Sequence, residues 1–116
     1  MLIPIKKEHE KIAMGLLSFM PRDNKGIVVQ KVLKMYETSP NHQLYLYKNE
    51  KDRFVGVVGV EDLDGSVYIT DLTVDPSHRN EGLGSLMIKM IEDMKSIRVL
   101  GTNDTELFVK HYQNQS

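Results

Sequence analysis

Two glycines, Gly82 and Gly84, follow Arg79 in a segment that could hold an anionic ligand. Glycine has no Cβ, so the backbone there can turn tightly and approach a bound group closely. The residues after Gly84 have the apolar spacing of a helix. A helix start offers unpaired N–H groups and the positive end of a dipole. With the charge of Arg79 added, this segment predicts a cradle suited to a pyrophosphate.

Neighbouring motifs fit this segment less well. It lacks the third glycine of a dinucleotide-binding fingerprint, and no Gly-Lys-Ser/Thr follows as in a P-loop. The chain has no cysteine, which excludes disulfides, thiolate metal sites and a cysteine nucleophile. Its four histidines, at positions 9, 42, 78 and 111, do not have metal-ligand spacing, so we expect no metal site.

Three side chains are the candidates for acid–base chemistry, and each also has a structural explanation. Asp71 is either a general base or a strand residue that bonds to backbone amides. Glu61 is either a base or a solvated residue beside a hairpin, whereas Tyr68 is either a proton donor or a packed aromatic residue. The sequence leaves these alternatives open.

The elements that must position these residues follow from the apolar spacing. Strands are predicted over residues 2–5, 44–48, 54–60, 67–75 and 97–100, and the middle three read as an antiparallel meander. Helices are predicted over 8–20, from 23 or 24 to 37, and over 82–95, and a last helix contains residues 107–112. This order predicts an α/β fold with a central mixed, mostly antiparallel sheet flanked by helices.

The fourth predicted strand carries an irregularity near Thr70. Apolar side chains at Val67 and Ile69 belong to one face, whereas those at Leu72 and Val74 belong to the other under strict alternation. A β-bulge near this point would shift the register by one residue, and bulges are frequent beside active sites. A strand buried on both faces is the alternative; we expect the bulge.

Length and net charge limit the number of domains and the kinds of partner that we expect. The 116 residues fit one domain, 1–116. A net charge of −1 gives no electrostatic footprint for nucleic acid or for an anionic membrane, so neither is expected as a partner. No apolar run approaches the length of about 20 residues that a membrane span needs, and no signal-peptide pattern opens the chain. We therefore expect a cytoplasmic protein.

One arrangement resembles a known family. Leu72-Thr73-Val74-Asp75-Pro76 forms an L-x-V-x-P segment, and R-x-x-G-x-G at Arg79 to Gly84 opens a helix rich in Leu and Met. This arrangement, within residues 44–112, resembles the GNAT family of acetyl-CoA-dependent N-acetyltransferases. The resemblance implies a GNAT-type fold, acetyl-CoA as cofactor and transfer of an acetyl group to a primary amine of a small molecule or a peptide.

The resemblance also implies which residues hold the cofactor. Backbone groups of three strand residues should pair with the pantetheine arm, and six backbone amides should hold the pyrophosphate. Asn103 matches an asparagine near the cofactor, and Phe108 and Lys110 match a Tyr-x-Lys pattern that flanks the sulfur. The strand residues are Leu72, Thr73 and Val74; the amides belong to Asn80, Glu81, Gly82, Leu83, Gly84 and Ser85, and Arg79 adds charge.

The chain departs from the family pattern in ways that keep a second function open. Phe108 stands where a tyrosine often protonates the departing thiolate, and Tyr68 and Thr70 stand where a Glu or His base is frequent. The chain also resembles a C-terminally truncated family member, because two further strands usually follow the last helix. The alternative to an enzyme is therefore a weak or inactive acetyl-CoA-binding regulatory module.

A narrower likeness concerns the segment from Glu10 to Pro21. It is similar to that of small acetyltransferase-like proteins encoded in riboflavin-biosynthesis operons, which implies a link to riboflavin metabolism. With no further strands, the strand at 97–100 would be an open sheet edge, which proteins normally cover or pair. We therefore expect either a monomer whose last helix covers that edge or a homodimer across it.

Overall fold

A five-stranded sheet forms the centre of the computed structural model, which describes residues 1–20 and 29–115. The strand order is β1-β2-β3-β4-β5; the first three pairs of neighbours are antiparallel, and β4 and β5 are parallel. The sheet is therefore mixed and mostly antiparallel, as predicted. Its strands are β1 (Leu2–Pro4), β2 (His42–Lys48), β3 (Phe54–Leu63), β4 (Ser66–Val74) and β5 (Val99–Gly101).

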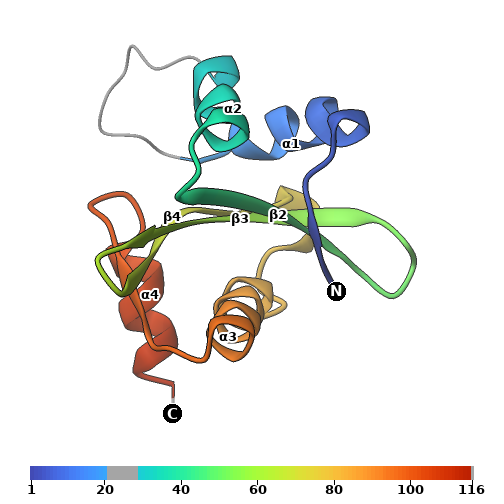
Figure 1. Ribbon diagram of the computed structural model, residues 1–116. Coiled ribbons are helices and arrows are strands. Elements are labelled where there is room, and N and C mark those ends of the chain that lie inside the picture. Colours follow the sequence, from blue (N-terminus) through green and yellow to red (C-terminus); the bar gives the residue numbers. More distant parts are fainter. Residues whose placement is uncertain (21–28, 116) are drawn as a thin grey trace.

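Helices cover both faces of this sheet (Figure 1). On one face lie α1 (Glu10–Leu17), preceded by the 3₁₀ turn η1 (Lys7–His9), and α2 (Val29–Thr38). On the other lie α3 (Leu83–Lys95) and α4 (Glu106–Gln113), and a short 3₁₀ turn η2 (Pro76–His78) connects β4 to α3. Each helical layer buries its own apolar cluster against the sheet, so the domain has two cores.

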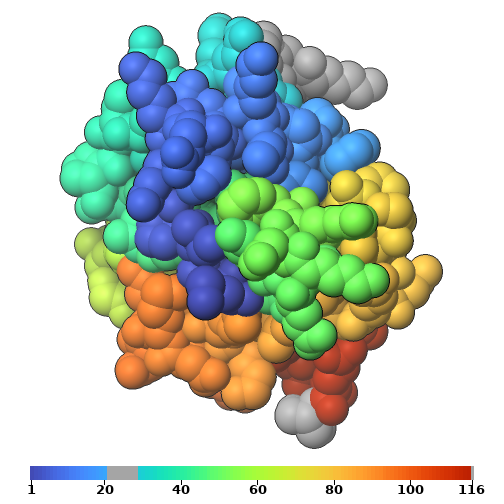
Figure 2. All heavy atoms as spheres, turned by 90° about the vertical axis from the view of Figure 1, so that its right-hand side faces the viewer, coloured from blue at the N-terminus to red at the C-terminus, as the bar shows by residue number. Residues whose placement is uncertain are grey.

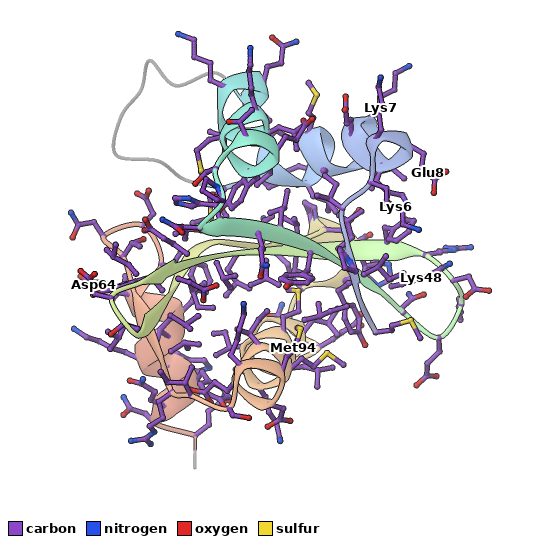
Figure 3. The ribbon with its side chains drawn as sticks, viewed as in Figure 1. Lys6, Lys7, Glu8, Lys48, Asp64 and Met94 are labelled. Atoms are coloured by element: carbon purple, nitrogen blue, oxygen red, sulfur yellow. The ribbon has the colours of Figure 1, made fainter. Side chains whose placement is uncertain are left out.

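Charged side chains lie outside these layers. Lys7, Glu8 and Asp64 point away from the sheet at the periphery of the molecule (Figure 3). At the surface, the N-terminal segment lies beside the β2–β3 turn (Figure 2), where the amino group of Met1 donates to the Lys48 carbonyl oxygen at 3.1 Å. The charged residues between Lys6 and Lys11 thus form a solvated surface around η1, which buries no residue.

The element bounds differ from the predicted ones mainly at helix ends. The first predicted helix ends at Leu17, because the Ser18 hydroxyl donates to the Gly15 carbonyl oxygen at 2.6 Å and 3₁₀-type bonds follow. The strand predicted from residue 97 begins at Val99, since Ser96 adopts a left-handed φ of 55° and closes α3. The predicted helix break at Pro21 and the predicted start of the second helix lie outside the described residues.

The predicted bulge is present in β4. Gly59 pairs with Asp71 and Val60 pairs with Ile69, so Thr70 is the extra residue of the β3–β4 pairing. The one-residue shift brings the apolar residues before and after Thr70 onto the same face, where all pack in the α3/α4 core. They are Val67, Ile69, Leu72 and Val74.

Two glycines of β3 leave room for side chains of the helices that cover the sheet. A Cβ at Gly59 would lie 2.5 Å from Cζ of Tyr36, on α2, and a Cβ at Gly56 would lie 2.9 Å from Cε of Met87, on α3. Both positions therefore serve close helix-to-sheet approach, which the sequence alone did not distinguish from approach by a substrate.

Candidate functional site

Within the described residues, the C-terminal half of β4 has a strand neighbour on one side only, whereas its N-terminal half lies between β3 and β5. Its register with β5 runs from Val67–Val99 to Ile69–Gly101, whereas β4 continues to Val74. β5 ends at Gly101, so in the part of the chain that the structure describes β4 has no strand partner on this side from Thr70 onward. An edge of β4 at residues 70–74 is therefore left for an extended ligand backbone to approach.

The turn after β4 is held by a local capping network. The Asp75 N–H donates to the Val55 carbonyl oxygen at 2.8 Å, and its carboxylate accepts from the backbone N–H and the hydroxyl of Ser77 at 2.9 and 2.7 Å. The Ser77 hydroxyl, followed by the Ser77 N–H, lowers the pKa of Asp75 from its usual value. Arg79 folds back so that its Nε donates to the Val74 carbonyl oxygen at 3.4 Å.

The start of α3 presents its backbone to the same region. Asn80 and Gly82 have φ of 67° and 76°, the left-handed conformation that turns the chain into the helix. The Leu86 N–H donates to the Gly82 carbonyl oxygen at 3.1 Å, so the N–H groups before it lie at the open helix end. A Cβ at Gly84 would meet only Leu72 Cδ2, at 3.8 Å. The two glycines therefore lie at the turn and at the open helix start, the two features from which the cradle was predicted.

These parts surround one cleft with a volume of about 450 Å³. Its walls come from β4, the β4–α3 turn, the start of α3, one face of α4, and the residues after α1. All but three of the predicted cofactor residues line it. The lining residues are Phe19, Leu72, Thr73, Val74, His78, Arg79, Asn80, Gly82, Leu83, Gly84, Ser85, Phe108, His111 and Gln115.

The three predicted cofactor residues that do not line the cleft are Glu81, Asn103 and Lys110. Glu81 points out of the turn, with Oε2 3.6 Å from His78 Nδ1. Asn103 lies before α4, which begins at Glu106. Lys110 is exposed, because two residues of spacing from Phe108 place it on a different face of the helix.

Four lining residues were missed at the sequence level. His78 belongs to the glycine segment itself, and His111 and Gln115 follow Phe108 at spacings of three and seven, so helical spacing could have found them. Phe19, which is 44% exposed, carries no such signal, since only the packing of the layers brings it to the cleft.

Asp71 lies below the helical layer and is 2% exposed. Its Oδ2 accepts a hydrogen bond from the Tyr36 hydroxyl, and the same hydroxyl lies 2.5 Å from Oγ1 of Thr70, the bulge residue. The carboxylate is not part of the cleft wall. It is joined to the bulge through Tyr36.

Glu61 and Tyr68 are register partners on β3 and β4, and His42 is the partner of Glu61 on β2. Paired residues share a sheet face, so the three side chains form one row. Oε2 of Glu61 lies 3.5 Å from Nε2 of His42, and Nδ1 of His42 lies 2.7 Å from Oγ of Ser39. The structure thus brings two of the predicted catalytic residues together, outside the cleft wall.

Tyr112 is turned away from the cleft. Its hydroxyl donates to Glu92 Oε1 at 2.6 Å, and this bond raises the pKa of Tyr112 to about 12. The hydroxyl therefore links α4 to α3. The buried residue of α4 is Val109, whereas Leu107 is 77% exposed and Phe108, in the cleft, is 47% exposed.

The described part of the chain contains neither a candidate metal site nor a candidate membrane-spanning helix. Residues 1–20 and 29–115 contain no group of three His, Cys, Asp or Glu side chains that could hold a metal ion. Over the same residues, no helix is both long enough and apolar enough to cross a bilayer.

Comparison with known proteins adds independent findings. A family model described as the acetyltransferase (GNAT) family matches residues 7–112. A protein of Bacillus methanolicus, described as an uncharacterized N-acetyltransferase in the lysA 3' region, is 42% identical over 112 residues, which are 95% of this chain and 92% of that protein.

Solved structures share the arrangement of sheet and helices. AAC(6')-Iy in complex with a bisubstrate analogue, CoA-S-monomethyl-acetylneamine, matches with a TM-score of 0.73 at 12% identity, over 99% of this chain and 86% of that one. A GNAT family acetyltransferase from Elizabethkingia anophelis with acetyl-CoA bound matches with a TM-score of 0.70 at 20% identity, over 100% and 74%. These matches confirm the predicted fold class.

Proposed function

We propose that this chain, which belongs to the GNAT family and is therefore an acetyltransferase that uses acetyl-CoA, transfers the acetyl group to a primary amine of a small molecule or a peptide. One observation carries the proposal: the open edge of β4 leads directly into the start of α3, within a single cleft of about 450 Å³. A ligand that joins an extended arm to an anionic group needs an open strand edge for the arm and a helix start for the anion.

The residues of the cleft fit acetyl-CoA. Backbone groups of Leu72, Thr73 and Val74 would pair with the pantetheine arm, since β5 has already ended at that level of β4. The N–H groups at the start of α3 would hold the pyrophosphate, close to the backbone because Gly84 has no side chain. Arg79 adds a positive charge at the same end. When bound, acetyl-CoA supplies the acetyl group as an activated thioester.

The transfer needs three contributions from the protein. A backbone N–H on the open edge near Val74 would polarise the thioester carbonyl oxygen. A base would remove a proton from the ammonium form of the acceptor, whose nitrogen then forms a C–N bond to the carbonyl carbon while the C–S bond breaks. Holding both reactants at the open edge of β4 supplies much of the acceleration.

For the base we propose Asp71 acting through hydroxyl groups. Its buried carboxylate accepts from Tyr36, and Tyr36 contacts Thr70 at the bulge, so a proton can pass from the bulge to Asp71. Glu61, paired with His42 and next to Tyr68, is the second candidate on the same sheet face. Substitutions Asp71→Asn and Glu61→Gln compare the two.

The test of the function is acetyl transfer to a panel of amines, followed by mass spectrometry of the products and by release of the CoA thiol. Gly84→Val is the matched negative control. It is expected to fold, because a Cβ there meets only Leu72 Cδ2 at 3.8 Å, yet to lose CoA binding in calorimetry. Arg79→Ala should weaken binding less, by about 1–2 kcal/mol. Unchanged transfer by a folded Gly84→Val variant would contradict the proposed site.

A CoA-binding module without turnover is the second candidate, and one observation favours it. Phe108 lines the cleft without a proton to donate, while the hydroxyl of Tyr112 is bonded to Glu92. The same experiment separates the two functions, since a module binds CoA but acetylates no amine of the panel. Amines of riboflavin biosynthesis belong in that panel because of the narrower sequence likeness.

A further inference from the structure

His111 brings an imidazole into the cleft from α4. It follows Phe108 by three residues, so both side chains come from one helix face, and both line the cleft. Phe108 is the residue that the family resemblance aligned with the CoA sulfur. His111 is therefore the neighbour of that position along the helix.

The ring of His111 is held by one identified contact. Nε2 of His111 lies 2.9 Å from Nε2 of Gln115, one helical turn further on. An amide nitrogen can only donate, so in this arrangement the neutral ring accepts at Nε2 and carries its proton on Nδ1. Gln115 also lines the cleft, so the amide orients the ring within the cleft wall.

The other groups of the described cleft wall that carry protons are less suited to protonating a leaving group. His78 lies in the turn before α3, with Nδ1 3.6 Å from the Glu81 carboxylate, at the end that would hold phosphate. Arg79 does not release its proton near neutral pH. The imidazolium form of a histidine donates a proton readily near neutrality, and His111 is exposed to solvent, which can return the proton.

We propose that His111 is the proton donor to the departing CoA sulfur, a role that rests on the proposed function. As the acceptor nitrogen forms its bond to the carbonyl carbon and the C–S bond breaks, the electron pair of that bond stays on sulfur. In its protonated form, His111 transfers a ring proton to this thiolate and becomes the neutral ring that accepts from Gln115 at Nε2. Solvent at the open side of the cleft then protonates the ring again. Gln115 is the positioning residue.

A binding experiment tests the contact without turnover. Calorimetry at mildly alkaline pH, where the CoA thiol is partly ionised, compares CoA with desulfo-CoA, which lacks the sulfur. The titratable side chains of the described cleft wall are Arg79 and His78 from the turn and His111 from α4, whereas Lys110, next to His111 on α4, lies outside the wall. We expect the protein to bind CoA about two- to tenfold more tightly than desulfo-CoA, as for one ordinary hydrogen bond.

The variant His111→Gln should abolish this preference and leave the affinity for desulfo-CoA unchanged, whereas His78→Gln, the matched cleft histidine, should keep it. With n-butylamine as acceptor, His111→Gln should lower kcat at least tenfold with little change in KM for acetyl-CoA. Equal affinities of the wild type for the two ligands, a preference that survives in His111→Gln, or its loss in both variants each overturns the assignment. A wild type that binds neither ligand instead refutes the proposed function itself.

Discussion

Replacing Gly59 by alanine is expected to disrupt the contact between α2 and the bulged strand. The new Cβ would lie 2.5 Å from Cζ and 2.8 Å from Cε1 of Tyr36, distances that a rigid aromatic ring in a packed layer cannot accept. Tyr36 is 5% exposed, so most of its ring is packed against neighbouring side chains. Its hydroxyl must leave both Thr70 and the buried carboxylate of Asp71.

The expected cost has two parts. Overpacking a core position costs about 1–3 kcal/mol. Loss of a hydrogen bond to a buried carboxylate adds about 1.5–3 kcal/mol. The free energy of unfolding should therefore fall by about 3–5 kcal/mol, which is a large part of the stability of a domain of this size.

Urea denaturation measures this change, and two other glycines are the matched controls. Gly56→Ala meets the flexible end of Met87 at 2.9 Å and should cost roughly 1 kcal/mol. Gly15→Ala, on the exposed side of α1 with nothing within 4 Å, should stabilise the protein by about 0.5–1 kcal/mol.

A second variant separates the two parts of the cost. In a Tyr36→Phe background the hydroxyl is already absent, so adding Gly59→Ala should cost only the packing part. A Gly59→Ala variant that loses less than about 1 kcal/mol, or equal costs in the two backgrounds, would refute the reasoning that Gly59 admits the Tyr36 hydroxyl.

Three further outcomes are expected. Tyr112→Phe should lower the free energy of unfolding by about 1 kcal/mol near neutral pH without changing turnover. Because folding raises the pKa of Tyr112 from 10.0 to about 12, the stabilisation is complete below pH 10, and denaturation curves of the two proteins should converge as pH rises from 10 to 12. Phe108→Tyr should raise kcat by at most about tenfold, because a phenol in the cleft adds a second donor; a fall in kcat would show that Phe108 is needed for packing against the cofactor. Light scattering at micromolar concentration should give a monomer, since the outer N–H and carbonyl of Val99 on β5 are bonded to the side chains of Glu92 and Gln113 at 2.9 and 3.4 Å; a dimer mass would contradict this protection of the edge.

Much of the fold could be predicted from residues 42–101, where the signals are local. Val, Ile, Tyr and Thr with turn residues between them mark β2, β3 and β4, and the regular Leu/Met spacing marks α3. Even the bulge at Thr70 could be located, because the apolar pattern changes phase within a single strand. Helix ends were predicted less well, since capping bonds such as that of Ser18 decide them.

The candidate site also has one part that the local sequence predicts and another part that it does not. Residues from Leu72 to Ser85 are contiguous, and their chemistry depends on a strand, a turn and a helix start that follow one another in the chain. The opposite wall comes from α4 and from Phe19, which no local pattern connects to that segment. Lys110 was placed beside the CoA sulfur together with Phe108 by the family's Tyr-x-Lys pattern, although a helix turns by about 200° over two residues.

The sequence by itself therefore determined the backbone cradle, because glycine positions, a helix start and a strand end act over a few neighbouring residues. Tertiary structure alone decided what faces the cradle and what lies beneath the bulge. The packing of α4 against the sheet and α3 places His111 in the cleft and the Tyr112 hydroxyl at Glu92. Because Tyr36 packs over Gly59, its hydroxyl reaches the carboxylate of Asp71. These choices depend on contacts between residues far apart in the chain, whose distances are set by how whole layers pack and not by any local spacing.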